Sequence, residues 1–361
     1  MNLNENELQP LEEWLKLEAE STNQFPQGKN DYFKRYWGIK SYLAEMVYPY
    51  VAAGTSAEDG GIYTDHSLDH FNAVIRNAGE LLGLGKDSDI SKTKINIKPY
   101  EVFITLVSIL LHDAGNINGR RNHEKQALKI FKGMGIALCP DAFEAMFIAN
   151  IARAHGGKVN VNGVDSKDTI ESLKLGDKES YASIPYRPKL IAALVRFADE
   201  ISEDRSRSAR FLLQVGNLPP QSEVFHYYAD SISSVDVDLP DRSITIKFEM
   251  LKEKLVRTYG KDNGEGGYDN VYLIDEINSR LEKMFRELHY CKKYMYELSH
   301  IHKIKVKIII YDEDGTQLDE SNNFLLEDLG YPNESFSFKD THPEWRGKLI
   351  CDKLIGEEES I

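Results

Sequence analysis

Apolar residues recur every three or four positions through most of the first 215 residues, which is the spacing of one face of an α-helix. Residues 100–113 differ because they are apolar on every side, and such a segment is typical of a helix at the centre of a bundle. The other predicted helices are amphipathic and cover residues 11–20, 31–51, 65–85, 123–135, 141–157 and 187–214. This part of the chain is therefore predicted to be a helical bundle.

The pattern changes after residue 215. Apolar and polar residues alternate in residues 231–239, 242–250 and 303–311, which predicts half-buried strands. A long amphipathic helix is expected at residues 271–298. The predicted fold class is thus mainly α, with a helical domain in residues 1–215 and a C-terminal α+β accessory domain, for oligomerisation or regulation, in residues 216–361.

Residues 156–187 interrupt the helical pattern with a polar stretch rich in Gly, Ser, Asp and Lys. Long connections inside compact domains are often lids or binding loops. We therefore expect this segment to be a long connection near a binding site.

Charge and composition narrow the classes of partner. The 361 residues carry a formal net charge of −14, which argues against a broad basic surface for long nucleic acids but leaves small phosphates open. The N-terminus has no apolar segment typical of a signal peptide, and no run approaches the roughly 18 apolar residues of a membrane span. Three scattered cysteines suit a reducing compartment. A cytoplasmic protein without membrane contact is predicted.

Candidate chemistry is concentrated in the helical part. His112 and Asp113 end the apolar segment, where an uncompensated carboxylate would be costly to bury. A metal ion would satisfy both, since imidazole and carboxylate together suit Fe, Mn, Zn or Co. Five of the ten histidines lie in residues 66–155, at His66, His70, His112, His123 and His155.

Two more positions are candidates by their spacing. His66 and His70 are four residues apart and share one helix face. Asp199 borders the apolar stripe of its helix, so it is either a surface charge or a ligand supplied from across the bundle.

Four segments together, "DHSLDH", "LLHDAG", "NHEKQA" and "VRFADEIS", resemble the HD superfamily of metal-dependent phosphohydrolases. The resemblance covers about residues 60–215 and implies an HD-type helical bundle around one or two divalent metals. It places the metal ligands at His70, His112, Asp113 and Asp199. The metal is Mn, Fe, Mg, Zn, Co or Ni, since such ligand sets accept several ions.

The segment "NHEKQALKIF" is similar to a His-Glu segment of the dNTP triphosphohydrolase branch. That likeness implies that His123 is the general acid or base and that Glu124 orients it. The chain departs from that branch directly after the His-Asp pair, where it has "AGNINGRRN", and it lacks the "GK" of the cyclic-di-GMP phosphodiesterases.

Six further side chains are candidates for substrate contact. Guanidinium groups match phosphate oxygens, and the basic residues flank the His-Glu pair or follow Asp199. Each also has an ordinary interpretation as a surface charge or, for His155, as a cation that complements a helix dipole. The six are His66, His155, Arg120, Arg121, Lys125 and Arg205.

The predicted function is metal-dependent hydrolysis of nucleotides, with a (deoxy)nucleoside triphosphate triphosphohydrolase first. The alternatives are a phosphodiesterase acting on cyclic nucleotides or short oligonucleotides, and a nucleotide-sensing component of a bacterial signalling or defence system. The partners we expect are a nucleotide substrate, a nucleotide regulator and further copies of the chain.

Overall fold

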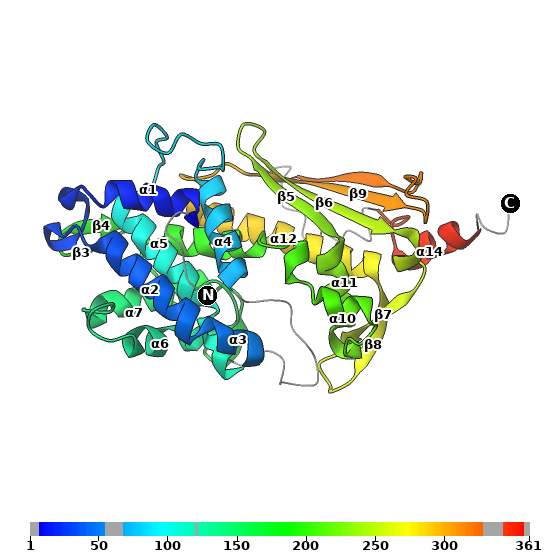
Figure 1. Ribbon diagram of the computed structural model, residues 1–361, viewed down its shortest axis with the longest axis horizontal. Helices are drawn as coiled ribbons and strands as arrows, with labels where there is room; N and C mark the ends of the chain where they lie inside the picture. The colour runs from blue at the N-terminus through cyan, green and yellow to red at the C-terminus, as the bar shows by residue number, and fades with distance from the viewer. Residues whose placement is uncertain (1–6, 55–67, 120–121, 328–341, 357–361) are drawn as a thin grey trace. The chain divides into compact units, whose positions relative to one another are not determined.

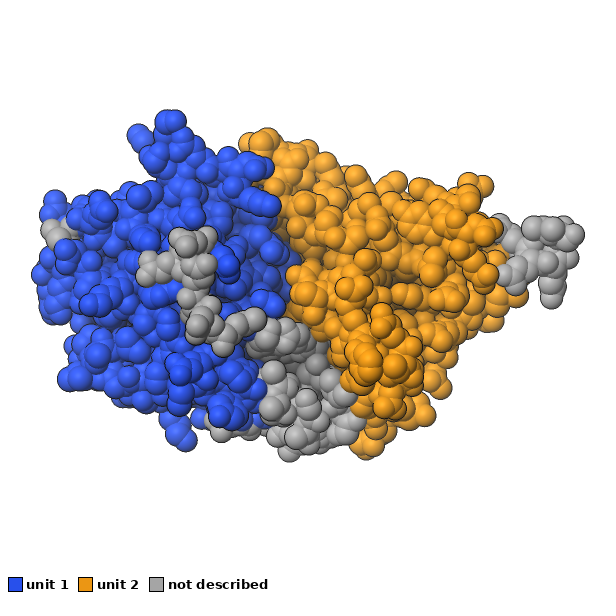
Figure 2. Space-filling model, in the orientation of Figure 1, with its two compact units in different colours: residues 1–55, 66–202, 290–300 blue, residues 56–65, 203–289, 301–361 orange. Residues whose placement is uncertain are grey.

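The computed structural model describes residues 7–54, 68–119, 122–327 and 342–356. The chain forms two compact units (Figure 2). Unit 1 contains residues 1–55, 66–202 and 290–300, and unit 2 contains residues 56–65, 203–289 and 301–361. The division into domains at residue 215 stays a prediction.

Unit 1 is a bundle of helices, as Figure 1 shows. Its described α-helices are α1 (Pro10–Glu18), α2 (Tyr32–Met46), α3 (Tyr48–Gly54), α4 (Leu68–Leu81), α5 (Pro99–His112), α6 (Ala127–Gly133), α7 (Ala142–Arg153), α8 (Thr169–Ser172) and α9 (Pro188–Glu200). Short 3₁₀ turns lie between them at η2 (Thr22–Gln24), η3 (Pro26–Gly28), η4 (Ala114–Asn118) and η5 (His123–Lys125). The prediction of a helical front part is confirmed at this level.

Helix α5 is the centre of the bundle. Every one of its residues is buried, and it packs against α1, α2, α4, α7 and α9. Pro99 occupies its first turn, where a missing N–H costs nothing, and Glu101 accepts a hydrogen bond from the backbone N–H of Lys98 at 2.9 Å. The all-round apolar pattern therefore predicted the central helix correctly.

A buried polar cluster fastens the outer helices to this centre. Glu144 of α7 accepts hydrogen bonds from Arg35 of α2 at 2.5 Å and from the Tyr100 hydroxyl of α5 at 2.8 Å. Burial, followed by the nearby Glu144 carboxylate, raises the pKa of Tyr100 well above its usual value. The phenol therefore stays a hydrogen-bond donor to Glu144.

Two predictions about residues 156–214 are wrong in detail. Residues 156–187 are not one irregular connection, because they contain α8 and two hairpins: β1 (Val159–Val161) with β2 (Val164–Ser166), and β3 (Glu179–Tyr181) with β4 (Ile184–Tyr186). The first turn has Asn162 at φ 52° and Gly163 at φ 86°, as the type I′ hairpin turn requires. The adjacent Asn162-Gly163 pair in the sequence is the pattern that predicts this hairpin turn.

The second wrong prediction is the continuous helix at residues 187–214. Helix α9 ends at Glu200, and the chain continues in unit 2 as η6 (Arg205–Arg207) and α10 (Arg210–Gln214). Asp204 starts η6 by accepting a hydrogen bond from the Ser206 backbone N–H at 2.7 Å. Short polar side chains of this kind compete with helical hydrogen bonds, which explains the break.

Unit 2 contains a four-stranded sheet in the order β10-β9-β6-β5. Its strands are β5 (Ile232–Asp238), β6 (Ser243–Leu251), β9 (Lys303–Tyr311) and β10 (Asn322–Glu327), and only the β6–β9 pair is parallel. Alternate residues of β6 and β9 are buried, so the three strands expected in this region are confirmed. Helix α11 (Glu223–Ser231) contacts β5 and β6.

The remaining described elements of unit 2 are η7 (Pro220–Ser222), η8 (Lys252–Lys254), the hairpin of β7 (Thr258–Asp262) and β8 (Tyr268–Tyr272), and α14 (Gly347–Gly356). The predicted long helix is α12 (Leu273–Met295), and the boundary between the units falls inside it, after His289. The structure thus combines a mainly helical unit with an α+β unit. No described helix is both long and apolar enough to span a membrane.

The last segment of unit 1 is tied to it by hydrogen bonds. The Tyr290 hydroxyl donates to Asp168 at 2.7 Å and accepts from the backbone N–H of Ile170 at 3.0 Å. Arg187 joins Glu101 at 2.7 Å and Glu297 at 2.6 Å. Residues 290–300 therefore complete the helical unit from a distant part of the sequence.

Candidate metal centre

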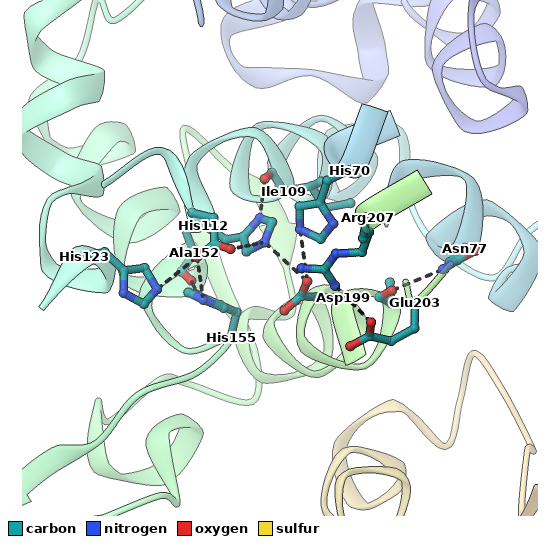
Figure 3. Close-up of polar contacts among 12 residues, drawn as sticks. His70, Asn77, Ile109, His112, His123, Ala152, His155, Asp199, Glu203 and Arg207 are labelled. Carbon is teal, nitrogen blue, oxygen red and sulfur yellow. Dashed lines mark hydrogen bonds and ion pairs between the residues drawn. The ribbon is translucent and has the colours of Figure 1, made fainter. Parts of the chain in front are cut away.

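Six imidazole and carboxylate side chains from five parts of unit 1 converge at the end of the central helix. Figure 3 shows the four histidines and Asp199 gathered there. They come from α4 (His70), the end of α5 (His112 and Asp113), η5 (His123), the residues after α7 (His155) and α9 (Asp199).

The end of α5 explains how two adjacent residues can serve one site. Neighbours on an ideal helix point about 100° apart. His112 is the last residue of α5, and Asp113 leaves the helix with φ −109° and ψ 1°. This change of backbone direction brings the His112 Nε2 atom and the Asp113 Oδ2 atom to 3.6 Å.

The first cluster joins α4, α5 and α9. The Asp199 Oδ1 atom lies 3.4 Å from His70 Nε2 and 3.5 Å from His112 Nε2. These separations exceed those of ordinary hydrogen bonds. Atoms that bind one ion at about 2.1 Å lie roughly 3.0–3.4 Å apart, so the spacing approaches that of ligands to a shared metal.

The second cluster uses the other oxygen of Asp113. Its Oδ1 atom lies 2.9 Å from His123 Nε2 and 3.5 Å from His155 Nε2. The donor atoms of Asp113, His123 and His155 form one compact group, and those of His70, His112 and Asp113 form another; a third group, of His112, His155 and Asp199, links them. Asp113 is shared by both groups, so one carboxylate could bridge two ions.

Backbone carbonyl groups fix the orientation of two of the rings. The His112 Nδ1 atom is 2.6 Å from the Ile109 carbonyl oxygen, and His155 Nδ1 is 2.7 Å from the Ala152 carbonyl oxygen. An Nδ1–H group that donates to a carbonyl leaves the Nε2 lone pair for a metal. Both rings therefore present Nε2 towards Asp113.

The charges of His112 and Asp199 stabilise one another in this cluster. Burial lowers the pKa of His112, but the carboxylates of Asp113 and Asp199 outweigh it and raise the pKa to about 9. Burial raises the pKa of Asp199, but His112 and His70 hold it well below its usual range. The Asp199 carboxylate is thus ionised and can attract a cation.

The donor set fits a divalent metal. His112 is fully buried, and among the described residues its Nε2 atom makes no well-formed hydrogen bond, with the Asp113 and Asp199 carboxylates at 3.6 and 3.5 Å. Buried polar atoms normally have partners, and an ion held with Asp113 and Asp199 would supply one. Imidazole nitrogens and carboxylate oxygens accept Mn, Fe, Co, Ni or Zn, and the ligand types do not select among them.

The other candidate residues are placed as follows. Glu124 is buried, with its Oε2 atom 3.7 Å from His123 Nδ1, so it can orient that ring through a short-range attraction. Lys125 is exposed and donates to the Asn122 side chain. Arg205 belongs to unit 2 and donates to the Asp230 carbonyl oxygen at 2.8 Å. His66, Arg120 and Arg121 lie outside the described residues.

Reasoning from the sequence placed His123 and His155 in catalytic and substrate-binding roles. The structure adds a further interpretation, in which both are ligands of a second ion. A histidine directly after a helix can donate from Nδ1 to the backbone carbonyl three residues earlier, which leaves its Nε2 lone pair for a metal. The position of His155 just after a predicted helix was therefore a signal in the sequence for a ligand role. The approach of His123 to Asp113 had no such local signal.

Comparison with protein families gives a match to the family described as HD-CE, over residues 61–283. The chain belongs to the HD-CE family. The match contains all six residues of the candidate HD-CE metal centre and extends past residue 215, through β5 and β6 into α12. No curated protein and no solved structure matches the chain. An HD-type domain is thus supported, as is a hydrolase of the HD type.

Proposed function

We propose that the protein is a divalent-metal-dependent phosphohydrolase that acts on nucleotides, with (deoxy)nucleoside triphosphates as its first substrate class. The observation that carries the proposal is the position of Asp113, whose Oδ2 atom lies 3.6 Å from His112 Nε2 and whose Oδ1 atom lies 2.9 Å from His123 Nε2 and 3.5 Å from His155 Nε2. Membership of the HD-CE family supports the reaction class.

The residues divide into two ligand sets. His70, His112, Asp113 and Asp199 would hold one ion, and His123 and His155 would hold a second together with Asp113. Bound there, a divalent ion lowers the pKa of a coordinated water and polarises a phosphoryl oxygen. In the reaction, a water oxygen bonds to phosphorus, the phosphorus–oxygen bond to the leaving group breaks, and the proton from water ends on the leaving oxygen.

His123 has two roles compatible with its surroundings. Its Nε2 atom is within hydrogen-bond distance of Asp113, and its Nδ1 atom faces Glu124. In a one-metal enzyme the ring can carry the proton to the leaving oxygen, with the two carboxylates holding its charge. In a two-metal enzyme the same ring is a ligand. The number of ions per chain separates these alternatives.

The test combines metal analysis with a substrate screen. The purified protein, loaded with Mn²⁺, Fe²⁺, Co²⁺, Ni²⁺, Zn²⁺ or Mg²⁺, is incubated with each dNTP and NTP. Release of nucleoside and tripolyphosphate is expected, because water would attack the phosphorus bonded to the 5′ oxygen. The proposal is refuted if no nucleotide is hydrolysed with any of these metals.

Phosphodiester hydrolysis is the second candidate, and the shared carboxylate favours it. Two ions held by one carboxylate can stabilise both the attacking and the leaving oxygen of an in-line displacement at phosphorus. A cyclic nucleotide or short oligonucleotide would then yield a nucleoside monophosphate. Chromatography of the products distinguishes this outcome from tripolyphosphate release.

Self-association and a nucleotide regulator are also proposals. They extend the expectation that the C-terminal part of the chain serves oligomerisation or regulation. Light scattering with and without each nucleotide tests both, since a regulator that acts through assembly would change the measured mass.

A further inference from the structure

A cavity of about 430 Å³ lies in unit 1 at the start of helix α5. Its walls come from the segment before α5, from β4 with the residue after it, and from residues 290–300. Lys98, which lines it, directly precedes α5, and His112 ends that helix 14 residues later. At 1.5 Å per residue, the cavity is about 20 Å from the candidate metal centre. It is therefore a separate place on the unit.

The charged side chains around this cavity do not balance. Among the described residues that line it, Lys98, Lys178 and Arg187 bring three positive charges. Glu297 brings one negative charge, so the lining has a net charge of +2 (3 − 1 = 2). The whole chain, in contrast, carries −14. A local concentration of positive charge in an acidic protein attracts small anions.

The two lysines are free to contact a ligand. Both are exposed, and within the described part of the chain neither ammonium group forms an ion pair. An ammonium group on a flexible stem can turn towards any acceptor within its reach. Lys98 and Lys178 can therefore approach one anion from two walls of the cavity.

Arg187 has one fixed partner and one that a ligand could replace. Its Nε and Nη2 atoms donate to the two carboxylate oxygens of Glu101 at 2.8 and 2.7 Å, and Glu101 is fully buried. Such a two-bond pair fixes the plane of the guanidinium. The Nη1 atom donates instead to Glu297, whose side chain is 43% exposed, at 2.6 Å. An anion could thus take the place of Glu297 without disturbing Glu101.

The remaining wall suits an apolar or aromatic group. Pro185 and Tyr186 of β4 line it. Tyr186 is fixed, because it is buried and its hydroxyl donates to Glu179 at 2.8 Å. Cavities of roughly 300–1,000 Å³ with apolar walls and a few convergent polar groups are typical of sites for small molecules. The expected ligand therefore joins an anion to a small apolar body.

We propose that this cavity binds a small organic phosphate, namely a phosphate monoester with an aromatic or apolar body. A monoester carries about −1.5 to −2 charges at pH 7, which matches the lining better than the single charge of a carboxylate. The phosphate contacts the ammonium groups of Lys98 and Lys178. It also accepts from Arg187 Nη1 in place of Glu297. The body packs on the wall formed by β4.

Reductive labelling of the metal-free full chain with pyridoxal 5′-phosphate tests the position of the site. The probe is an aromatic phosphate monoester whose aldehyde condenses with a lysine amine, releases water, and leaves an imine that borohydride reduces to a stable amine. Peptide mass spectrometry should find the label on Lys98 or Lys178 rather than on Lys34, an exposed lysine of α2. Pyridoxal, which has no phosphate, should not show this preference, and pyrophosphate should suppress it.

Calorimetry with pyridoxine 5′-phosphate, which has no aldehyde, tests the role of charge. The double variant Lys98→Gln with Lys178→Gln should bind at least about tenfold more weakly, because two charge-assisted hydrogen bonds are lost. Glu297→Gln should bind about threefold more tightly, since the carboxylate that competes for Arg187 is gone. Lys34→Gln is the matched control and should leave binding unchanged.

The pattern of results decides the proposal. Selective labelling together with opposite shifts in affinity for the lysine and glutamate variants supports it. No measurable binding overturns it, as does labelling concentrated at Lys125 near the candidate metal centre. Weaker binding in Glu297→Gln as well as in the lysine variant also overturns it, because a general structural loss would then explain both. All of these measurements omit the metal, so they do not depend on whether the protein hydrolyses any nucleotide.

Discussion

Asp113 is the residue on which the candidate site depends. Its backbone closes the central helix, and its two oxygens lie 3.6 Å from His112 Nε2 and 2.9 Å from His123 Nε2. The His-Asp pair after an apolar helix predicted His112 and Asp113 as candidate metal ligands, and the resemblance to the HD superfamily added His70 and Asp199. The approach of His123 and His155 to the same carboxylate depends on how η5 and α7 pack, and no local pattern encodes that packing.

Replacement of Asp113 should abolish metal binding. In Asp113→Asn the amide has almost the same shape but no negative charge, so both ligand groups lose their shared anion. Metal content, measured by elemental analysis after dialysis, should fall close to zero, and hydrolysis should fall by more than about 100-fold. Asp177→Asn, at an exposed aspartate of the same unit, should keep full metal content. Retained metal in Asp113→Asn would contradict the site.

Metal binding should release protons. The pKa of His112 is raised to about 9 in the metal-free protein, so the ring is protonated at pH 7 and must lose its proton to bind an ion. Metal affinity should rise from pH 6.5 to 9. The stability that His112 gives the metal-free protein is present below pH 6.5 and is lost as the pH rises through 9.

Two measurements check this linkage. Calorimetric titrations with Mn²⁺ at pH 7, in buffers of different ionisation enthalpy, should give different heats because the buffer takes up the released proton. Equal heats in all buffers would contradict it. The free energy of unfolding of the metal-free protein, measured in urea titrations, should be lower at pH 9 than at pH 6.5.

At the scale of elements, the apolar helices were the most predictable part of the chain. The apolar faces of neighbouring helices pack against one another. The pattern of positions that must be buried is therefore enough to predict such helices, as α5 and α9 show. The predicted helix at residues 123–135 is instead η5 followed by α6. Asn122 adopts a left-handed backbone with φ 58°, and η5 packs on η4, so tertiary contact overrides the local helical pattern.

The contact between η4 and η5 should control the second ligand group. Gly115→Ala would place a Cβ 2.0 Å from the His123 carbonyl oxygen, so η5 must move and His123 must leave Asp113. In a two-metal enzyme the metal content should fall from two ions to one. Gly133→Ala is the matched control, since a Cβ at that position meets nothing within 4 Å. Equal metal content in the two variants would count against the second group.

The cluster around Glu144 should dominate the stability of the outer helices. Glu144→Ala removes the partner of Arg35, whose guanidinium is itself buried, and an uncompensated buried charge is costly. The free energy of unfolding should fall by about 3–5 kcal/mol in urea titrations. Glu13→Ala, at an exposed first-turn glutamate of α1, should change it by less than about 1 kcal/mol. Similar losses in the two variants would argue against the cluster.

At the scale of the whole molecule, the sequence indicated a helical part and an α+β part but not how the chain is shared between them. Residues 290–300 belong to unit 1, although they follow the predicted boundary by 75 positions (290 − 215 = 75). The amphipathic pattern of residues 271–298 predicted one helix, and α12 is one helix. Periodicity cannot show that the last turn of a helix contacts a different unit from its first turn.

A fragment that ends at residue 215 should therefore be less stable than the full chain. It lacks Tyr290 and Glu297, so Asp168 loses the Tyr290 hydroxyl, and Arg187 keeps Glu101 but loses Glu297. Its melting temperature should be lower by about 5 °C or more. A synthetic peptide of residues 287–302 should restore part of the loss, whereas a scrambled peptide should not. A fragment as stable as the full chain would refute this expectation.

The return of residues 290–300 to the helical unit has a consequence for biosynthesis. A ribosome that has translated the whole candidate metal centre, up to Asp199, still has about ninety residues to add before the segment that completes the unit emerges. The nascent chain must keep its central helix protected from aggregation and proteolysis through that interval. The helical unit is thus expected to reach its full stability only when synthesis of unit 2 is already well advanced.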